Sequence, residues 1–208
     1  MNCQKTLLYI HGFLSSPLSV KAQQTKRWLL QHRPDIDYVC PQLTPYPDQC
    51  ATLLEKCIAA AIQPIYLMGS SIGGFWATWL AEKYNCKAVL INPAVDVLGL
   101  MPAYLNMDLK NYHTDDRYYL TQQHYQQLHA YHLRQLKRLE NYWLLVQTGD
   151  ETLDYRLAVE KYTACRQTVE QHGDHSFQGF ERFIAPAIEF YETPAYASKK
   201  HKANDMCP

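Results

Sequence analysis

Short apolar runs alternate with longer helix-like segments along most of the chain, and this alternation restricts the fold more than any other feature. Such runs are typical of strands that are buried on both faces of a sheet. Helices between them form β-α-β units, whose right-handed crossovers place helices on both faces of a parallel sheet. The alternation therefore predicts an α/β fold with about six mostly parallel strands.

The apolar runs predict strands at residues 6–10, 38–40, 65–68, 88–91, 142–147 and 168–170. The segments between and after them predict helices at residues 21–32, 50–62, 72–84, 156–165 and 180–191. A chain of 208 residues with 47% hydrophobic content can bury a sizeable core. We expect a single domain over residues 1–192, followed by a polar and disordered C-terminal tail at 193–208.

The charge balance and the cysteines narrow the class of protein. Basic and acidic residues number 20 each, which argues against nucleic acid or an anionic membrane as a partner. The seven cysteines are odd in number, scattered and without a C-x-x-C pair, which argues against a disulfide framework or a zinc site. We expect reduced thiols in a cytoplasmic protein, with no signal peptide and no membrane-spanning segment.

Residues 99–137 break the alternation, because they contain no clear strand. They are rich in tyrosine and histidine, namely Tyr104, Tyr112, Tyr118, Tyr119, Tyr125, Tyr131, His113, His124, His129 and His132. A long excursion in a compact domain is usually functional. We interpret it as a small helical cap inserted over one edge of the sheet; the alternative is a set of helices packed on the side of the sheet.

Glycines mark the ends of the predicted strands, at Gly12, Gly69, Gly73, Gly149 and Gly173. Each of these turns requires tight backbone geometry. Ligands of open parallel sheets bind outside the carboxyl ends of the strands. The residues in these turns are therefore the first candidates for a functional site.

The turn after the third predicted strand contains Gly69-x-Ser71-x-Gly73, which fits the G-x-S-x-G pattern. In this pattern the central serine lies on a sharp strand-to-helix turn that exposes its hydroxyl, and the flanking glycines leave room for the turn. The amide of the next residue, Ile72, lies at a helix N-terminus and can donate to an oxyanion. The pattern predicts that Ser71 is a nucleophile, whereas Ser70 is a small residue in a crowded turn.

A nucleophilic serine needs a histidine base and a carboxylate that orients it. In the order Ser, Asp, His, the chain offers Asp150 after the fifth strand and His175 after the last. Alternatives stay open for both roles. They are Asp154 and, more distantly, Asp96 as the carboxylate, His172 as the base, and Asp174 as a solvent-facing neighbour.

The loop after the first strand reads HGFLSSP and should supply the second oxyanion donor, from the amide of Phe13. His11 is more often structural at such a position, and Ser15 and Ser16 are expected to make turn contacts. His11, Ser15 and Tyr112 are further candidates for contact with the substrate.

The motifs YIHGF, GSSIGG, INPAV, QTGDE-x-LDY and GDHSF together resemble the α/β-hydrolase superfamily. HGFLSSP, PQL-x-PYP, GSSIGG-x-x-ATWLAE and NPAV are similar to the small bacterial YqiA/YcfP-like esterase family (UPF0227) in particular. The resemblance extends from Leu7 to about Tyr191. It implies a minimal hydrolase fold whose catalytic triad falls on Ser71, Asp150 and His175, with Phe13 and Ile72 as oxyanion donors. The two leading antiparallel strands of larger hydrolases are expected to be absent.

The resemblance implies an esterase or thioesterase that acts on a small-molecule acyl substrate without a metal or an organic cofactor. Two other classes of function share these residues. One is a hydrolase-fold binding or regulatory protein without turnover, and a broken triad would be its signature. The other is a different triad chemistry, such as that of a peptidase, a lactonase or a cofactor-free haloperoxidase.

Overall fold

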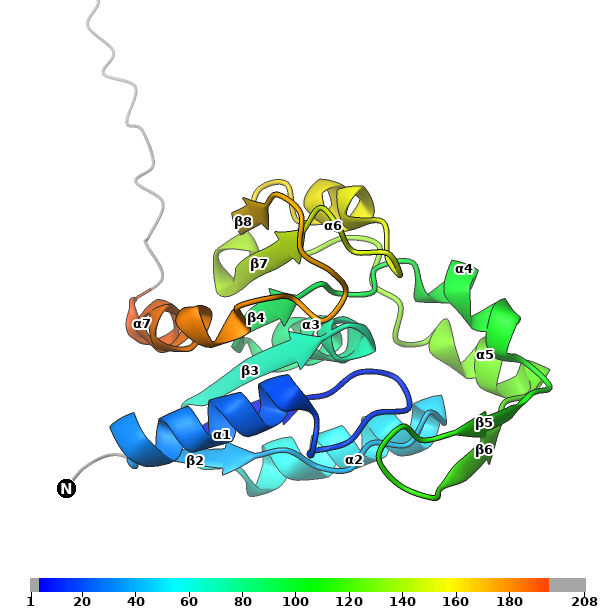
Figure 1. The fold of residues 1–208 in the computed structure, drawn as a ribbon. Helices are drawn as coiled ribbons and strands as arrows, with labels where there is room; N and C mark the ends of the chain where they lie inside the picture. The colour runs from blue at the N-terminus through cyan, green and yellow to red at the C-terminus, as the bar shows by residue number, and fades with distance from the viewer. Residues whose placement is uncertain (1–3, 195–208) are drawn as a thin grey trace, which may run out of the picture.

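The computed structural model describes residues 4–194 and contains a six-stranded sheet in which every neighbouring pair of strands is parallel (Figure 1). The strands lie in the order β2-β1-β3-β4-β7-β8. Their bounds are β1 Lys5–Ile10, β2 Ile36–Val39, β3 Ile65–Ser70, β4 Lys87–Ile91, β7 Tyr142–Gln147 and β8 Arg166–Glu170. The predicted parallel sheet is confirmed. The predicted tail lies outside the described residues, except for Thr193 and Pro194.

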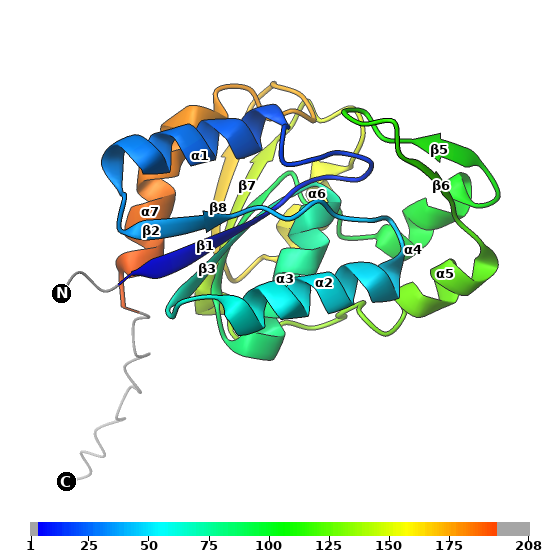
Figure 2. The same cartoon turned by 90° about the horizontal axis from the view of Figure 1, so that it is seen from below.

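Helices cover both faces of the sheet, as predicted (Figure 2). One face carries α1 (Val20–His32) and α7 (Ile184–Glu192), and the other carries α2 (Pro47–Ala60), α3 (Ile72–Tyr84) and α6 (Tyr155–Lys161). The last predicted helix begins instead as a 3₁₀ turn, η3 (Phe180–Phe183). Pro186 then falls in the first turn of α7, where its missing N–H leaves no hydrogen bond unmade.

Side chains of β1, β3, β4 and β7 alternate between two hydrophobic cores. In β1, Leu8 and Ile10 pack with α2 and α3, whereas Leu7 and Tyr9 pack with α1 and α7. Because both faces are covered, β1, β3, β4 and β7 read as nearly continuous apolar runs in the sequence. This double burial fixes the strands and therefore the turns at their carboxyl ends.

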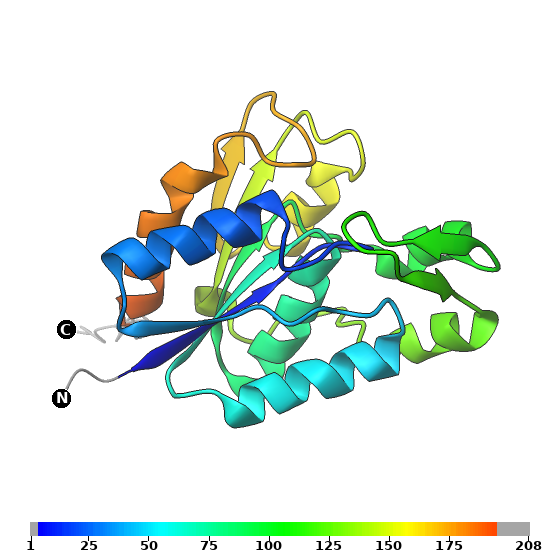
Figure 3. The ribbon, with the colours of Figure 1, turned by 60° about the horizontal axis from the view of Figure 1, so that its bottom comes forward.

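Most of the segment between β4 and β7 lies beyond the carboxyl ends of the strands (Figure 3), and its last part returns to the amino end of β7, where Asn141 contacts Asn85. The segment contains α4 (Val97–Leu100), η1 (Met101–Tyr104), β5 (Asp108–Lys110), β6 (Arg117–Tyr119), α5 (Gln122–Leu128) and η2 (Leu139–Asn141). The prediction that this segment has no strand is wrong, because β5 and β6 form an antiparallel pair. Each strand has only three residues, which is too short for an alternating pattern to stand out, and in β5 only Leu109 is buried.

None of the helices within residues 4–194 is both long and apolar enough to cross a membrane.

Candidate active site

Ser71 occupies the sharp turn between β3 and α3. Its backbone has φ 56° and ψ −124°, a conformation that non-glycine residues rarely adopt. Its N–H donates to Ile91 O at 3.0 Å, and its carbonyl accepts from the amides of Gly74 and Ala94, both at 2.9 Å. Ser71 is thus held by its backbone while its hydroxyl stays directed toward the cavity that it lines.

The two glycines of the motif are required by close backbone contacts. A Cβ atom on Gly73 would lie 1.9 Å from Ile10 O, and one on Gly69 would lie 2.3 Å from Gly73 O. Both distances are far below van der Waals contact. The turn therefore brings α3 against the ends of β1 and β3 more closely than any side chain would permit.

Three side chains from distant parts of the sequence meet at this turn. Nε2 of His175 lies 3.2 Å from Ser71 Oγ, and Nδ1 of the same ring lies 2.9 Å and 3.0 Å from the two carboxylate oxygens of Asp150. The side chain of Asp150 is 2% exposed and that of His175 is 25% exposed. A buried carboxylate therefore contacts one side of the ring, while the other side faces the serine.

Asp150 is the carboxylate that the structure brings to His175. Its Oδ1 also accepts from the amides of Thr152 and Leu153, at 2.9 Å and 2.8 Å. Asp154 instead caps α6 and pairs with Arg156. Asp96 caps α4, through the amide of Gly99.

His172 and Asp174, near the turn after β8, form no hydrogen bond with Ser71 among the described residues. His172 uses its backbone amide to donate to Thr148 Oγ1. Asp174 was expected to face solvent, but its side chain is half-buried. Its Oδ2 accepts from Gln178 Nε2, and its buried Oδ1 has no partner in the described part of the chain.

Two buried side-chain amides hold the loop that carries His175, and no motif in the sequence points to this role. Asn92 Nδ2 donates to the carbonyl of Asp174 at 2.9 Å and to that of His175 at 3.2 Å. Gln147 Oε1 accepts from the amides of Asp174 and Gln178. Asn92 follows β4, and Gln147 is the last residue of β7. A polar residue directly at the end of a buried strand is the sequence signal that could have identified both.

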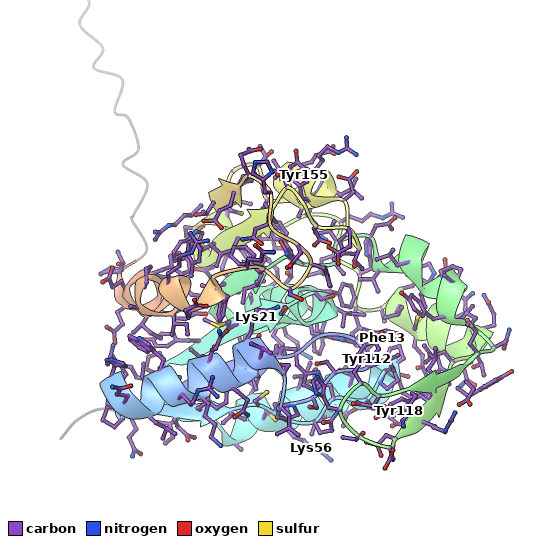
Figure 4. All side chains as sticks on the ribbon, viewed as in Figure 1. Phe13, Lys21, Lys56, Tyr112, Tyr118 and Tyr155 are labelled. Carbon is purple, nitrogen blue, oxygen red and sulfur yellow. The ribbon has the colours of Figure 1, made fainter. Side chains whose placement is uncertain are left out.

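A cavity of about 640 Å³ adjoins Ser71 and His175. Phe13 and Ile72 line it, and their amides donate to no other group among residues 4–194. Ser15 and Tyr112 line it as well. Figure 4 shows Phe13 and Tyr112 close together below the strand ends.

His11 lies outside the cavity. It is 1% exposed, and burial lowers its pKa to about 4, so its ring is neutral. Nδ1 lies 2.9 Å from Gly12 O and Nε2 accepts from the amide of Leu43 at 3.0 Å. The ring therefore contacts protein atoms and holds the loop after β1.

The described residues contain no group of three or more His, Cys, Asp or Glu side chains arranged to hold a metal ion.

Solved structures of several proteins share this architecture at low sequence identity. Alpha/beta hydrolase domain-containing protein 10 from mouse is 14% identical, with a TM-score of 0.67 over 88% of this chain and 89% of that chain. Est1E from Butyrivibrio proteoclasticus with bound ferulic acid is 12% identical, with a TM-score of 0.67 over 91% and 89%. The thioesterase domain from the curacin biosynthetic pathway is 14% identical, with a TM-score of 0.60 over 90% and 92%.

The sheet order, the turn at Ser71 and these likenesses define an α/β-hydrolase fold. A sequence profile of the Uncharacterised protein family (UPF0227) matches residues 6–192, and the chain belongs to this family. The resemblance noted from the motifs is thereby confirmed.

Proposed function

We propose that this protein is a serine hydrolase that cleaves acyl esters or thioesters. The proposal rests on the continuous hydrogen-bonded line from Ser71 Oγ through both ring nitrogens of His175 to the Asp150 carboxylate. A histidine held by a carboxylate is the group that activates a serine hydroxyl at neutral pH. The esterase and the thioesterase domain among the structural neighbours agree with this reaction class.

The reaction begins when Ser71 Oγ attacks the acyl carbonyl and its proton moves to Nε2 of His175. Asp150 accepts from Nδ1–H, which fixes the tautomer of the ring and stabilises the imidazolium. The imidazolium then protonates the leaving alcohol or thiol, leaving an acyl-enzyme on Ser71. Water then attacks the acyl carbonyl while His175 takes its proton. The bond between the acyl carbon and Ser71 Oγ breaks, His175 returns the proton to Ser71, and the acid is released.

The tetrahedral intermediate carries an oxyanion, and the amides of Phe13 and Ile72 are its proposed donors. Ile72 is the first residue of α3, where the helix dipole favours a negative charge. Both residues line the cavity beside Ser71. Loss of one such donor typically costs about 3–4 kcal/mol of transition-state stabilisation.

We further propose that residues 1–192 form one domain in which the segment at about 99–137 caps the active-site cavity. Met101, Tyr104 and Tyr112 of this segment line the cavity. Asn111 Nδ2 donates to Ser15 O, and the amide of Tyr112 donates to Leu14 O, both at 2.8 Å. The segment is therefore attached to the loop after β1, and Ser15 and Tyr112 are in position to contact a substrate.

The decisive test is hydrolysis of p-nitrophenyl esters of increasing acyl length by the wild type and by Ser71→Ala. We expect the wild type to hydrolyse these esters. The kcat/KM of the Ser71→Ala variant should be lower by several orders of magnitude, because the proposed nucleophile is gone. A parallel assay with acyl thioesters decides between the two leaving groups.

Ser70→Ala is the matched control, since Ser70 is the last residue of β3, directly before the proposed nucleophile, and His175 Nε2 bonds to Ser71 Oγ. The control should keep turnover of the wild-type order. Equal activity of Ser71→Ala and wild type would refute the assignment of the nucleophile.

A further inference from the structure

Lys21 is a cation inside the same cavity as Ser71 and His175. It is the second residue of α1, and Figure 4 shows its side chain between α1 and the chain segment that leads into α7. From α1 and the segment that leads into α7, the cavity lining is mixed and includes Ser19, Val20, Gln24, Ser176, Phe177, Phe180 and Glu181. The segment after β4 contributes the mostly apolar Val97, Met101 and Tyr104.

The ammonium group of Lys21 has one protein partner among the described residues. Nζ donates to Ser176 O at 2.7 Å, and no carboxylate oxygen of residues 4–194 lies within 4.0 Å of it. By contrast, Lys5, Lys83 and Lys110 each form an ion pair. An ammonium has three N–H donors, so two donors of Lys21 remain for a ligand in the cavity.

Burial lowers the pKa of Lys21 to about 8, and the carboxylates of Asp174 and Asp150 oppose this effect. The amine therefore stays mostly protonated at neutral pH. Polar groups that are largely buried are normally paired, so the two unused N–H donors of Lys21 beside a cavity indicate a ligand.

We propose that Lys21 binds a carboxylate of the substrate, so that the preferred substrates are esters or thioesters with a negatively charged group. This inference rests on the proposed hydrolase function. A carboxylate can accept from the two remaining N–H groups of Lys21, which would offset the desolvation of the ammonium. Asp174 does not fill this role, because its carboxylate bonds to Gln178 and lies beyond 4.0 Å.

The test compares three esters of one acyl length: p-nitrophenyl pentanoate, mono-p-nitrophenyl glutarate, and 3-carboxy-4-nitrophenyl pentanoate. The first is neutral, the second carries a carboxylate on the acyl group, and the third carries it on the leaving group. The readout is the ratio of kcat/KM for each charged ester to that for the neutral ester. We expect the wild type to prefer one charged ester, which identifies the end of the substrate that reaches Lys21.

Lys21→Met should lower that ratio at least about tenfold, because a hydrogen bond to a charged group is worth ~1.5–3 kcal/mol. Lys21→Arg should preserve most of the wild-type preference for the charged ester. Lys26→Met is the matched control, since Lys26 lies on the exposed side of the same helix and does not line the cavity, and it should leave the ratio unchanged.

Two results would overturn the inference: a wild type that prefers the neutral ester to both charged ones, or a ratio that is the same in Lys21→Met. The second result would mean that Lys21 acts only through its bond to Ser176, which affects all three esters alike. If the wild type hydrolyses none of the esters, the proposed function fails. Calorimetric binding of glutarate to wild type and to Lys21→Met then tests the site by itself, and equal affinities would refute it.

Discussion

At Ser71 the backbone adopts a conformation that typically costs a non-glycine residue about 1–3 kcal/mol. The surrounding structure imposes it: three backbone hydrogen bonds hold Ser71, and the close approach of Gly73 to β1 fixes the start of α3. In return, the serine hydroxyl stands clear of both elements and meets His175. Strain at this residue is thus the local cost of presenting the proposed nucleophile.

Asp150→Asn provides a test of the proposed triad at the residue scale. The asparagine would keep the shape of the side chain but would no longer stabilise the imidazolium or fix the required tautomer. We expect kcat to fall by roughly 10⁴-fold, with little change in thermal stability. Steady-state kinetics and a melting curve measure the two effects.

Asp154→Asn is the matched control, four residues further on. Asp154 is exposed, caps α6 and pairs with Arg156, and asparagine caps helices about as well as aspartate. The variant should keep kcat within a few-fold of the wild type. If Asp154→Asn were the damaging change and Asp150→Asn the mild one, the orienting carboxylate would have to be reassigned.

At the scale of elements, the turns after β1 and β3 form one packed unit. Gly73 approaches the carbonyl of Ile10, and Gly12 approaches Ser71. The hairpin of β5 and β6 is joined to the same region through Asn111, which is 3% exposed and donates to Ser15 O. The proposed nucleophile, the proposed oxyanion donors and the proposed cap are therefore joined by close packing and hydrogen bonds.

Two glycine substitutions test how tightly these elements pack. Gly73→Ala would place a Cβ 1.9 Å from a backbone oxygen, which cannot move without displacing β1. We expect a loss of several kcal/mol in the free energy of unfolding, or failure to fold. Gly12→Ala would place its Cβ 3.5 Å from Ser71 Cβ, an ordinary contact, and should cost less than about 1 kcal/mol. Urea denaturation of both variants measures the difference, and similar losses would show that the packing argument is wrong.

At the scale of the whole molecule, His11 couples the stability of the fold to pH. Burial lowers its folded-state pKa to about 4, whereas a histidine in an unfolded chain titrates near 6.5. Between these values the unfolded state binds more protons, so this contribution to stability is complete above pH 6.5 and is lost as the pH falls toward 4. The loss should be on the order of 3 kcal/mol.

His11→Gln tests this prediction, because the glutamine oxygen can still accept from the amide of Leu43 but does not titrate. The difference in unfolding free energy between wild type and variant should shrink as the pH is lowered from 7 to 4.5. Carboxylates with lowered pKa values, such as those of Asp35 and Glu192, lose their contribution mainly below this range. Parallel curves for the two proteins would contradict the role given to His11.

Patterns that span a few residues were readable from the sequence because local physics decides them. The runs at β1, β3, β4 and β7 are apolar on both faces, and the glycines beside Ser71 signal a turn that only they can make. The hairpin of β5 and β6 was missed because three-residue strands carry no periodic signal. The 3₁₀ start of the last helix was missed because propensity alone does not set helix ends.

The sequence by itself determined the parallel sheet, the position of the serine turn, and a short set of candidates for its partners. Only the tertiary structure shows which candidate carboxylate reaches His175, because Asp150 and Asp154 are equivalent in type and nearly adjacent in the chain. It also decided the burial of His11, the roles of Asn92 and Gln147, and the placement of Lys21 in the cavity. These properties depend on contacts between residues tens of positions apart, and no local pattern encodes them.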